Sequence, residues 1–88
     1  MVSRSVMIQN ETGVHARPAA AFVKLASQFP CDIFVEKDNT RINGKSIMGL
    51  MMLVLHQGAQ IMVIAEGEQE VEAVDALCAL IENNFRTP

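Results

Sequence analysis

Residues 2–29 read VSRSVMIQ, then NETGV, then HARPAAAFVKLASQF, and the spacing of the apolar residues changes once within this stretch. Over residues 2–9 apolar side chains fall on one face of an extended chain, which predicts a β-strand. From residue 16 they recur at helical spacing, which predicts an amphipathic helix over 16–28 that ends before Pro30. The turn between the two contains Gly13, so the chain opens as strand, turn and helix.

The rest of the chain continues with short elements. The patterns predict strands at 31–36, 40–43 and 60–66, a short helix at 47–53 and a last helix that opens in the acidic run 68–72. The last helix carries one apolar stripe, formed by Val74, Leu77, Cys78 and Ile81. This order of elements predicts a single α+β domain over residues 1–88, with helices covering one face of a mainly antiparallel sheet.

Composition excludes several classes of protein. Half of the 88 residues are apolar, which suits a packed globule. The net charge is −3 and the seven basic residues are scattered singly, so a nucleic-acid-binding surface is not predicted. No apolar run approaches the ~20 residues of a membrane span, and the N-terminus lacks the apolar stretch of a signal peptide. We therefore expect a cytoplasmic protein without membrane insertion.

The two cysteines, Cys31 and Cys78, lie far apart, and each falls within an apolar pattern. Neither belongs to a Cys/His cluster, so we predict two buried thiols, no metal site and no cofactor.

The sequence GVHARP at 13–18 carries the clearest chemistry. His15 lies where a glycine turn meets a helix, and the first N–H groups of a helix form a ready anion site. Pro18 is tolerated within the first helical turn, and Arg17 adds a planar fork of donors that suits phosphate oxygens. A neutral imidazole beside such an anion site can act as a nucleophile toward a phosphoryl group.

GVHARPA at 13–19 and GKSIMG at 44–49 together resemble the HPr phosphocarriers of the bacterial phosphoenolpyruvate-dependent phosphotransferase system, and IAEG at 64–67 fits the same family. The resemblance implies an open-faced β-sandwich of four antiparallel strands with three helices on one face. It also implies that enzyme I phosphorylates His15 on Nδ1 and that an EIIA domain receives the phosphate. Arg17 and the backbone of Ala16 and Arg17 would hold the phosphate. Such a protein is a carrier without independent enzymatic turnover.

Ser46 stands ahead of the short helix in the position of an N-cap. In many bacteria the equivalent serine is phosphorylated by HPr kinase/phosphorylase, so the resemblance adds a regulatory site at Ser46. A docking surface for partners is predicted around His15 at Ala20, Lys24, Ile47, Met48 and Met51. Leu50 and Leu53 are expected to face the sheet, and Met52 is expected to fill the core.

Alternatives to a carrier are a purely regulatory binding module that works through Ser46 and a hydrolase that uses His15. The intact loop around His15 favours the carrier, and no general base accompanies His15 in sequence. His56 is interpreted as a turn residue. A monomer is expected. The residues leave open whether the carrier serves sugar uptake or the nitrogen-related regulatory branch.

Overall fold

One antiparallel sheet forms the frame of this computed structural model, which describes residues 1–86. The strands lie in the order β1 (Val2–Met7), β4 (Gln60–Glu66), β2 (Asp32–Lys37) and β3 (Thr40–Asn43). Strands β2 and β3 form a hairpin that turns at Asp38 and Asn39, whose φ angles are +50° and +66°. Two central residues with positive φ are typical of a type I′ turn, and Asp and Asn tolerate that conformation well.

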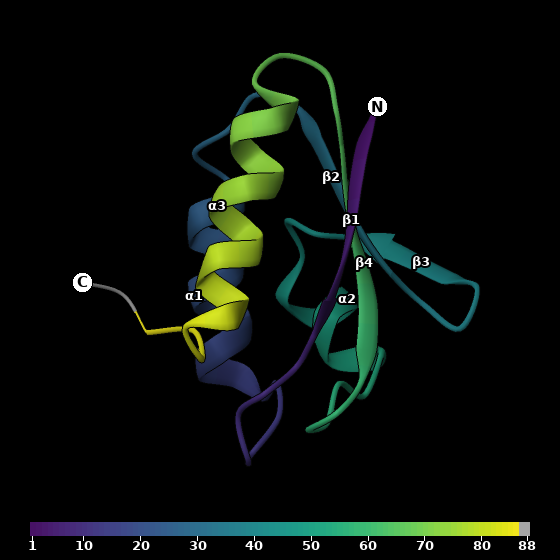
Figure 1. The fold of residues 1–88 in the computed structure, drawn as a ribbon, viewed down its shortest axis with the longest axis vertical. Helices are drawn as coiled ribbons and strands as arrows, with labels where there is room; N and C mark the ends of the chain where they lie inside the picture. The colour runs from purple at the N-terminus through teal and green to yellow at the C-terminus, as the bar shows by residue number, and fades with distance from the viewer. Residues whose placement is uncertain (87–88) are drawn as a thin grey trace.

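Three helices cover one face of the sheet: α1 (Ala16–Ala26), α2 (Ile47–Met52) and α3 (Glu70–Glu82). Figure 1 shows α1 and α3 on the same side of the sheet, with α2 near the end where α1 begins. Helix α3 packs on β1 and β4, and α1 packs on both α2 and α3. The predicted fold class is confirmed. In the described part of the chain no helix is long and apolar enough to cross a membrane.

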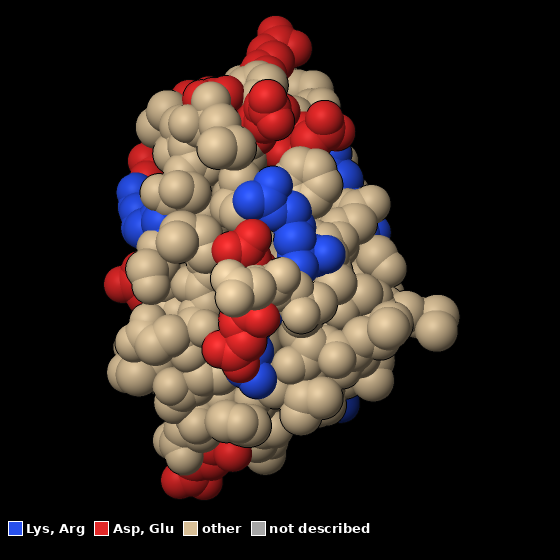
Figure 2. All heavy atoms as spheres, turned by 90° about the vertical axis from the view of Figure 1, so that its right-hand side faces the viewer, with Lys and Arg blue, Asp and Glu red and all other residues tan. Residues whose placement is uncertain are grey.

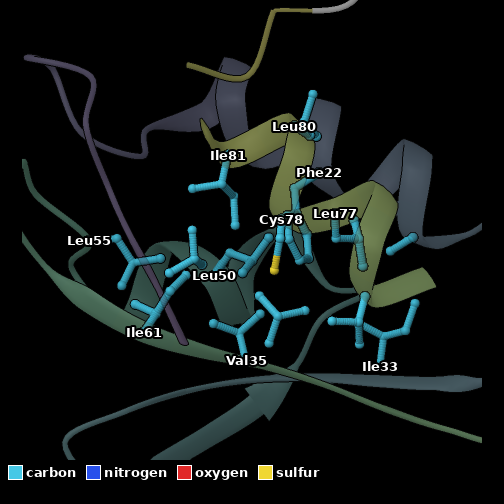
Figure 3. Close-up of a cluster of buried hydrophobic side chains, with 14 of the residues drawn as sticks. Phe22, Ile33, Val35, Leu50, Leu55, Ile61, Leu77, Cys78, Leu80 and Ile81 are labelled. Atoms are coloured by element: carbon cyan, nitrogen blue, oxygen red, sulfur yellow. The ribbon is translucent and has the colours of Figure 1, made fainter. Parts of the chain in front are cut away.

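The core lies between the helices and the sheet. In Figure 3 the labelled side chains of the helices and of the strands point toward one another. Phe22, Ile33 and Val35 are almost fully buried, as is the predicted stripe of α3. Both cysteines are buried free thiols, as predicted. Burial raises the pKa of the Cys78 thiol, which keeps this cysteine protonated and unreactive.

The other face of the sheet is open, and Figure 2 views the molecule from that side. Most of the surface seen there is uncharged, with several acidic side chains at the upper end and others in the middle and at the lower end. The guanidinium of Arg41 lies 5.7 Å from the centre of the Phe34 ring, and its Nε donates to Glu36. The Arg41 side chain therefore contacts Phe34 and Glu36 of the same sheet.

The structure corrects the bounds of several predicted elements and one prediction of burial. Strand β1 ends at Met7 and not at residue 9, β2 spans Asp32–Lys37 and not 31–36, and α2 ends at Met52 and not at residue 53. Helix α1 ends at Ala26, two residues before the predicted end, because the amide of Gln28 bonds to Leu25 in a tighter final turn. The prediction that Met52 fills the core is wrong, since its side chain is 75% exposed. Helix α2 has only six residues, and Leu50 with the following Leu53 occupies its buried side, which leaves no core position for Met52.

Candidate functional site

The loop before α1 is held against the segment that follows α2. Gly13 has φ +67°, and a Cβ at this residue would lie 2.5 Å from the carbonyl oxygen of Leu55. The amide of Val14 donates to that carbonyl over 2.7 Å. Only glycine combines the left-handed conformation with so close an approach of two backbones. This contact fixes the position of His15, two residues further on.

Helix α1 begins without a capping side chain. His15 is the extended N-cap residue and makes no side-chain cap bond, and the first turn contains no acidic residue. The amides of Ala16 and Arg17 have no hydrogen-bond partner within residues 1–86, while Pro18 has no N–H. His15, Ala16 and Arg17 are all exposed. The terminus therefore offers two free N–H donors and a positive dipole to an anion, beside an imidazole and a guanidinium.

His15 and Arg17 line the same open hollow, of about 900 Å³. Residues 9–12 of the preceding loop and residues 84–86 of the turn after α3 also line this hollow. The structure thus brings the predicted His15 and Arg17 together. It adds the C-terminal turn, which the sequence analysis missed because no local pattern connects residues about seventy positions apart.

Ser46 caps α2 as predicted. Its Oγ accepts a hydrogen bond of 3.0 Å from the amide of Gly49, and the residue is half-buried. The adjacent Lys45 is engaged elsewhere, since its Nζ donates to the carbonyl of Phe29 over 2.8 Å. Lys45 therefore ties the end of α1 to the start of α2.

A group of exposed apolar side chains follows Ser46, and we call it the α2 patch. It comprises Ile47, Met48, Met51, Met52 and Val54. The first three are predicted docking residues, and Met48 is 76% exposed. Ala20 and Lys24, also predicted, are exposed on α1, which packs against α2. Val54 was not among the predicted docking residues.

Val54 holds a conformation that β-branched residues rarely adopt, with φ +52°. The carbonyls of Leu53 and Val54 both accept long hydrogen bonds, of 3.5 and 3.4 Å, from Nζ of Lys37. Those bonds hold the turn that exposes Val54 at the edge of the α2 patch.

His56 is exposed, and its carbonyl accepts from the amide of Ala59 in a turn, as predicted. The described residues contain no group of three or more His, Cys, Asp or Glu side chains that could hold a metal ion.

The comparison with protein families decides the identity. Residues 2–83 match PTS-HPr, the family described as the PTS HPr component phosphorylation site. The chain belongs to the HPr family. It is an HPr-family phosphocarrier of the phosphotransferase system, as the resemblance of its motifs implied.

Relatives in this family carry two kinds of name. The chain is 50% identical over 82 residues to the HPr-like protein Crh of Halalkalibacterium halodurans, covering 93% of this chain and 98% of Crh. It is 42% identical over 85 residues to the phosphocarrier protein HPr of Treponema pallidum, covering 97% of each. Family membership therefore includes both phosphocarrier HPr and HPr-like Crh.

Solved structures agree with the fold. A crystal structure of HPr-C-His from Thermoanaerobacter tengcongensis is 50% identical and superposes with a TM-score of 0.94, covering 100% of this chain and 99% of that one. A crystal structure of an HPr dimer from the same organism is also 50% identical, with a TM-score of 0.78 and coverage of 99% and 100%. The four-stranded antiparallel open sheet with three helices is thus the HPr fold.

Proposed function

We propose that this HPr-family protein accepts a phosphoryl group on His15 from enzyme I and passes it to an EIIA domain. The observation that carries the proposal is the position of His15, exposed at the uncapped start of α1 beside Arg17. An imidazole nitrogen attacks the phosphorus of the phosphorylated donor, the bond from phosphorus to the donor breaks, and a new P–N bond forms. Reversal of the same step on an EIIA histidine discharges the carrier.

The residues around His15 have separate roles in this proposal. The amides of Ala16 and Arg17 and the guanidinium of Arg17 stabilise the charge on the phosphoryl oxygens as the group moves. Phosphoryl transfer needs mainly positioning and charge stabilisation, so no metal or cofactor is required of the carrier itself.

His15 and His56 are the two histidines of the chain, and both are exposed, which gives a matched pair of variants. Incubation with phosphoenolpyruvate and enzyme I should add one acid-labile phosphate, detected by intact mass and phosphorus NMR. His15→Ala should abolish the label, and His56→Ala should retain it. Unchanged labelling of His15→Ala would refute the assignment of the acceptor.

Partners would dock on Ala20 and Lys24 of α1 and on Ile47, Met48 and Met51 of the α2 patch. Exposed methionines adapt to more than one partner surface, and Lys24 adds a positive charge at the rim. We propose that enzyme I and EIIA bind there in turn, with the carrier acting as a monomer.

Met48→Asp tests the docking surface, because it places a charge in the centre of the α2 patch. We expect kcat/KM for phosphoryl acceptance from enzyme I to fall by about tenfold, the equivalent of ~1.4 kcal/mol. Val71→Asp is the control, since Val71 is exposed on α3 and outside the patch. Equal losses of kcat/KM in the two variants would contradict docking at the α2 patch. Light scattering of the unmodified protein would test whether the carrier is a monomer.

A regulatory role at Ser46 is the second candidate, favoured by its place at the edge of the α2 patch and by the similarity to Crh. HPr kinase/phosphorylase would add about −2 charge at a helix start, where the dipole tolerates it, in front of an approaching partner. Incubation with this kinase and ATP should then give an acid-stable phosphate that Ser46→Ala lacks. A chain that takes the Ser46 phosphate but no His15 phosphate would be a regulatory module alone.

A further inference from the structure

The cations of this protein divide into two groups according to their contacts. Arg4, Lys37 and Arg41 lie within 4.0 Å of a carboxylate oxygen, and Lys45 donates to a carbonyl. Within residues 1–86 the other three basic side chains have no carboxylate partner: Arg17, Lys24 and Arg86. In a chain of net charge −3, the cations without a carboxylate partner thus lie at both ends of α1, at Arg17 and Lys24, and just after α3, at Arg86.

Arg86 connects the members of this second group. It lines the open hollow that His15 and Arg17 line. It also lines a neighbouring hollow between α1 and α3, whose wall includes Lys24. Arg86 follows His15 by about seventy residues in the sequence, and the fold returns it to the same hollow.

The turn that carries Arg86 is anchored. Phe85 is 8% exposed and packs in the core against Val14, the residue before His15. The amide of Arg86 donates to the carbonyl of Asn83, and the Asn83 side chain donates back to the carbonyl of Arg86. Its backbone is thus fixed on both sides, so that the guanidinium starts from a defined place beside the site.

We propose that Arg86 is a second guanidinium of the phosphoryl site and contacts the phosphoryl oxygens on His15 opposite Arg17. This inference rests on the proposed function of His15. A phosphoryl group brings about −2 charge, and Arg17 with two amides neutralises it from the α1 side alone. Arg86 supplies charge-assisted donors from a second segment, the turn at residues 84–86, which lines the same hollow.

The test uses inorganic phosphate as the probe and the unphosphorylated full chain. Phosphate is titrated at low ionic strength while the ring signals of His15 are followed by NMR. Arg86→Gln should raise the apparent Kd for phosphate by about threefold, within the range for exposed charge pairs, and Arg86→Lys by less. Added salt should diminish the difference, because the contact is exposed to solvent.

Arg41→Gln is the matched control, because it removes the same charge from the sheet side of the molecule, where Arg41 pairs with Glu36. It should leave the Kd unchanged. The amide spectrum of Arg86→Gln should stay that of the folded protein, since the bonds between Asn83 and residue 86 involve only the backbone of Arg86.

Each outcome decides the proposal. A phosphate Kd that is unchanged in Arg86→Gln, or raised equally in Arg41→Gln, would overturn the role of Arg86, as would a wild-type His15 that does not respond to phosphate. Failure of the proposed function would be seen in a different experiment, as the absence of the enzyme I-dependent label on wild-type His15. A weakened phosphate site in Arg86→Gln, an unchanged Kd in Arg41→Gln and enzyme I-dependent labelling of wild-type His15 would support both.

Discussion

Helices α1 and α2 both begin after an extended N-cap residue, His15 and Ser46, but only one of the two N-cap side chains bonds the first turn of its helix. At α2 the Ser46 hydroxyl accepts from the amide of Gly49, so the helix satisfies its own donor. At α1 the N-cap is His15, whose side chain makes no cap bond, and the amides of Ala16 and Arg17 are left free within residues 1–86. A capped terminus contributes to stability, whereas an uncapped and exposed one keeps its donors available for a ligand.

Helix α3 differs from α1 in having carboxylates at its start. Its first turn contains Glu70 and Glu72, and the carboxylate of Glu70 accepts from the amide of Gly67 over 3.0 Å. The amino group of Met1 lies 3.2 Å from the same carboxylate. Two of three helix starts are therefore stabilised by side chains, and the third carries the candidate acceptor.

The largest expected effect comes from giving α1 a cap of its own. His15→Asp should abolish phosphoryl acceptance completely, because the nucleophile is gone. Relative to His15→Ala, it should raise the free energy of unfolding by about 1 kcal/mol, since an aspartate at an N-cap bonds the free amides. Chemical denaturation measures the difference. An aspartate variant no more stable than the alanine variant would contradict the free donors at this terminus.

A smaller effect is expected at the capped start of α2. Ser46→Ala should lower the free energy of unfolding by about 1 kcal/mol, because the amide of Gly49 loses its acceptor. Ser46→Asp keeps an acceptor and should retain most of the stability, while slowing acceptance from enzyme I by like-charge repulsion if the partner surface is acidic. Equal stability of wild type and Ser46→Ala would show that the cap bond contributes nothing measurable.

The smallest effect is a pH dependence at the start of α3. The hydrogen bond from the amide of Gly67, and then the amino group of Met1, hold the pKa of the Glu70 carboxyl below its usual range. A depressed pKa stabilises the fold above the pKa of glutamate in the unfolded chain, and this contribution is lost as the pH falls through the lower, folded pKa.

Glu70→Gln should therefore lower the Tm slightly at pH 7, and the difference from wild type should shrink as the pH is lowered toward 3. Glu68→Gln is the control, because it removes the same charge nearby without removing the bond to Gly67. A Tm difference for Glu70→Gln that is constant with pH would argue against a stabilising role of the ionised carboxylate in the bond from Gly67.

Much of this protein follows from local pattern. The alternation of residues 2–7 and 60–66 gives strands because a period of two puts every second side chain on the core face. The stripe of α3 and the cap at Ser46 follow from helical spacing and from the need to satisfy the first amides. The site around His15 could be predicted for the same reason, since the candidate acceptor, the guanidinium and the helix start are neighbours in the chain.

Other features depend on residues distant in sequence. Leu50 and Leu53 occupy the buried side of a six-residue helix, as expected, but the exposure of Met52 and Val54 depends on how far the core extends beneath that helix. The approach of Gly13 to Leu55 is likewise invisible in either segment alone.

The sequence by itself determined the element order, the family and the candidate acceptor His15, because each depends on residues that are close in the chain. Only the tertiary structure decided that Arg86 shares a hollow with His15, that Gly13 approaches Leu55, and that Met52 and Val54 are exposed. The physical reason is that local periodicity fixes which side of an element is buried. Which distant side chains then meet is fixed by how the buried sides pack together.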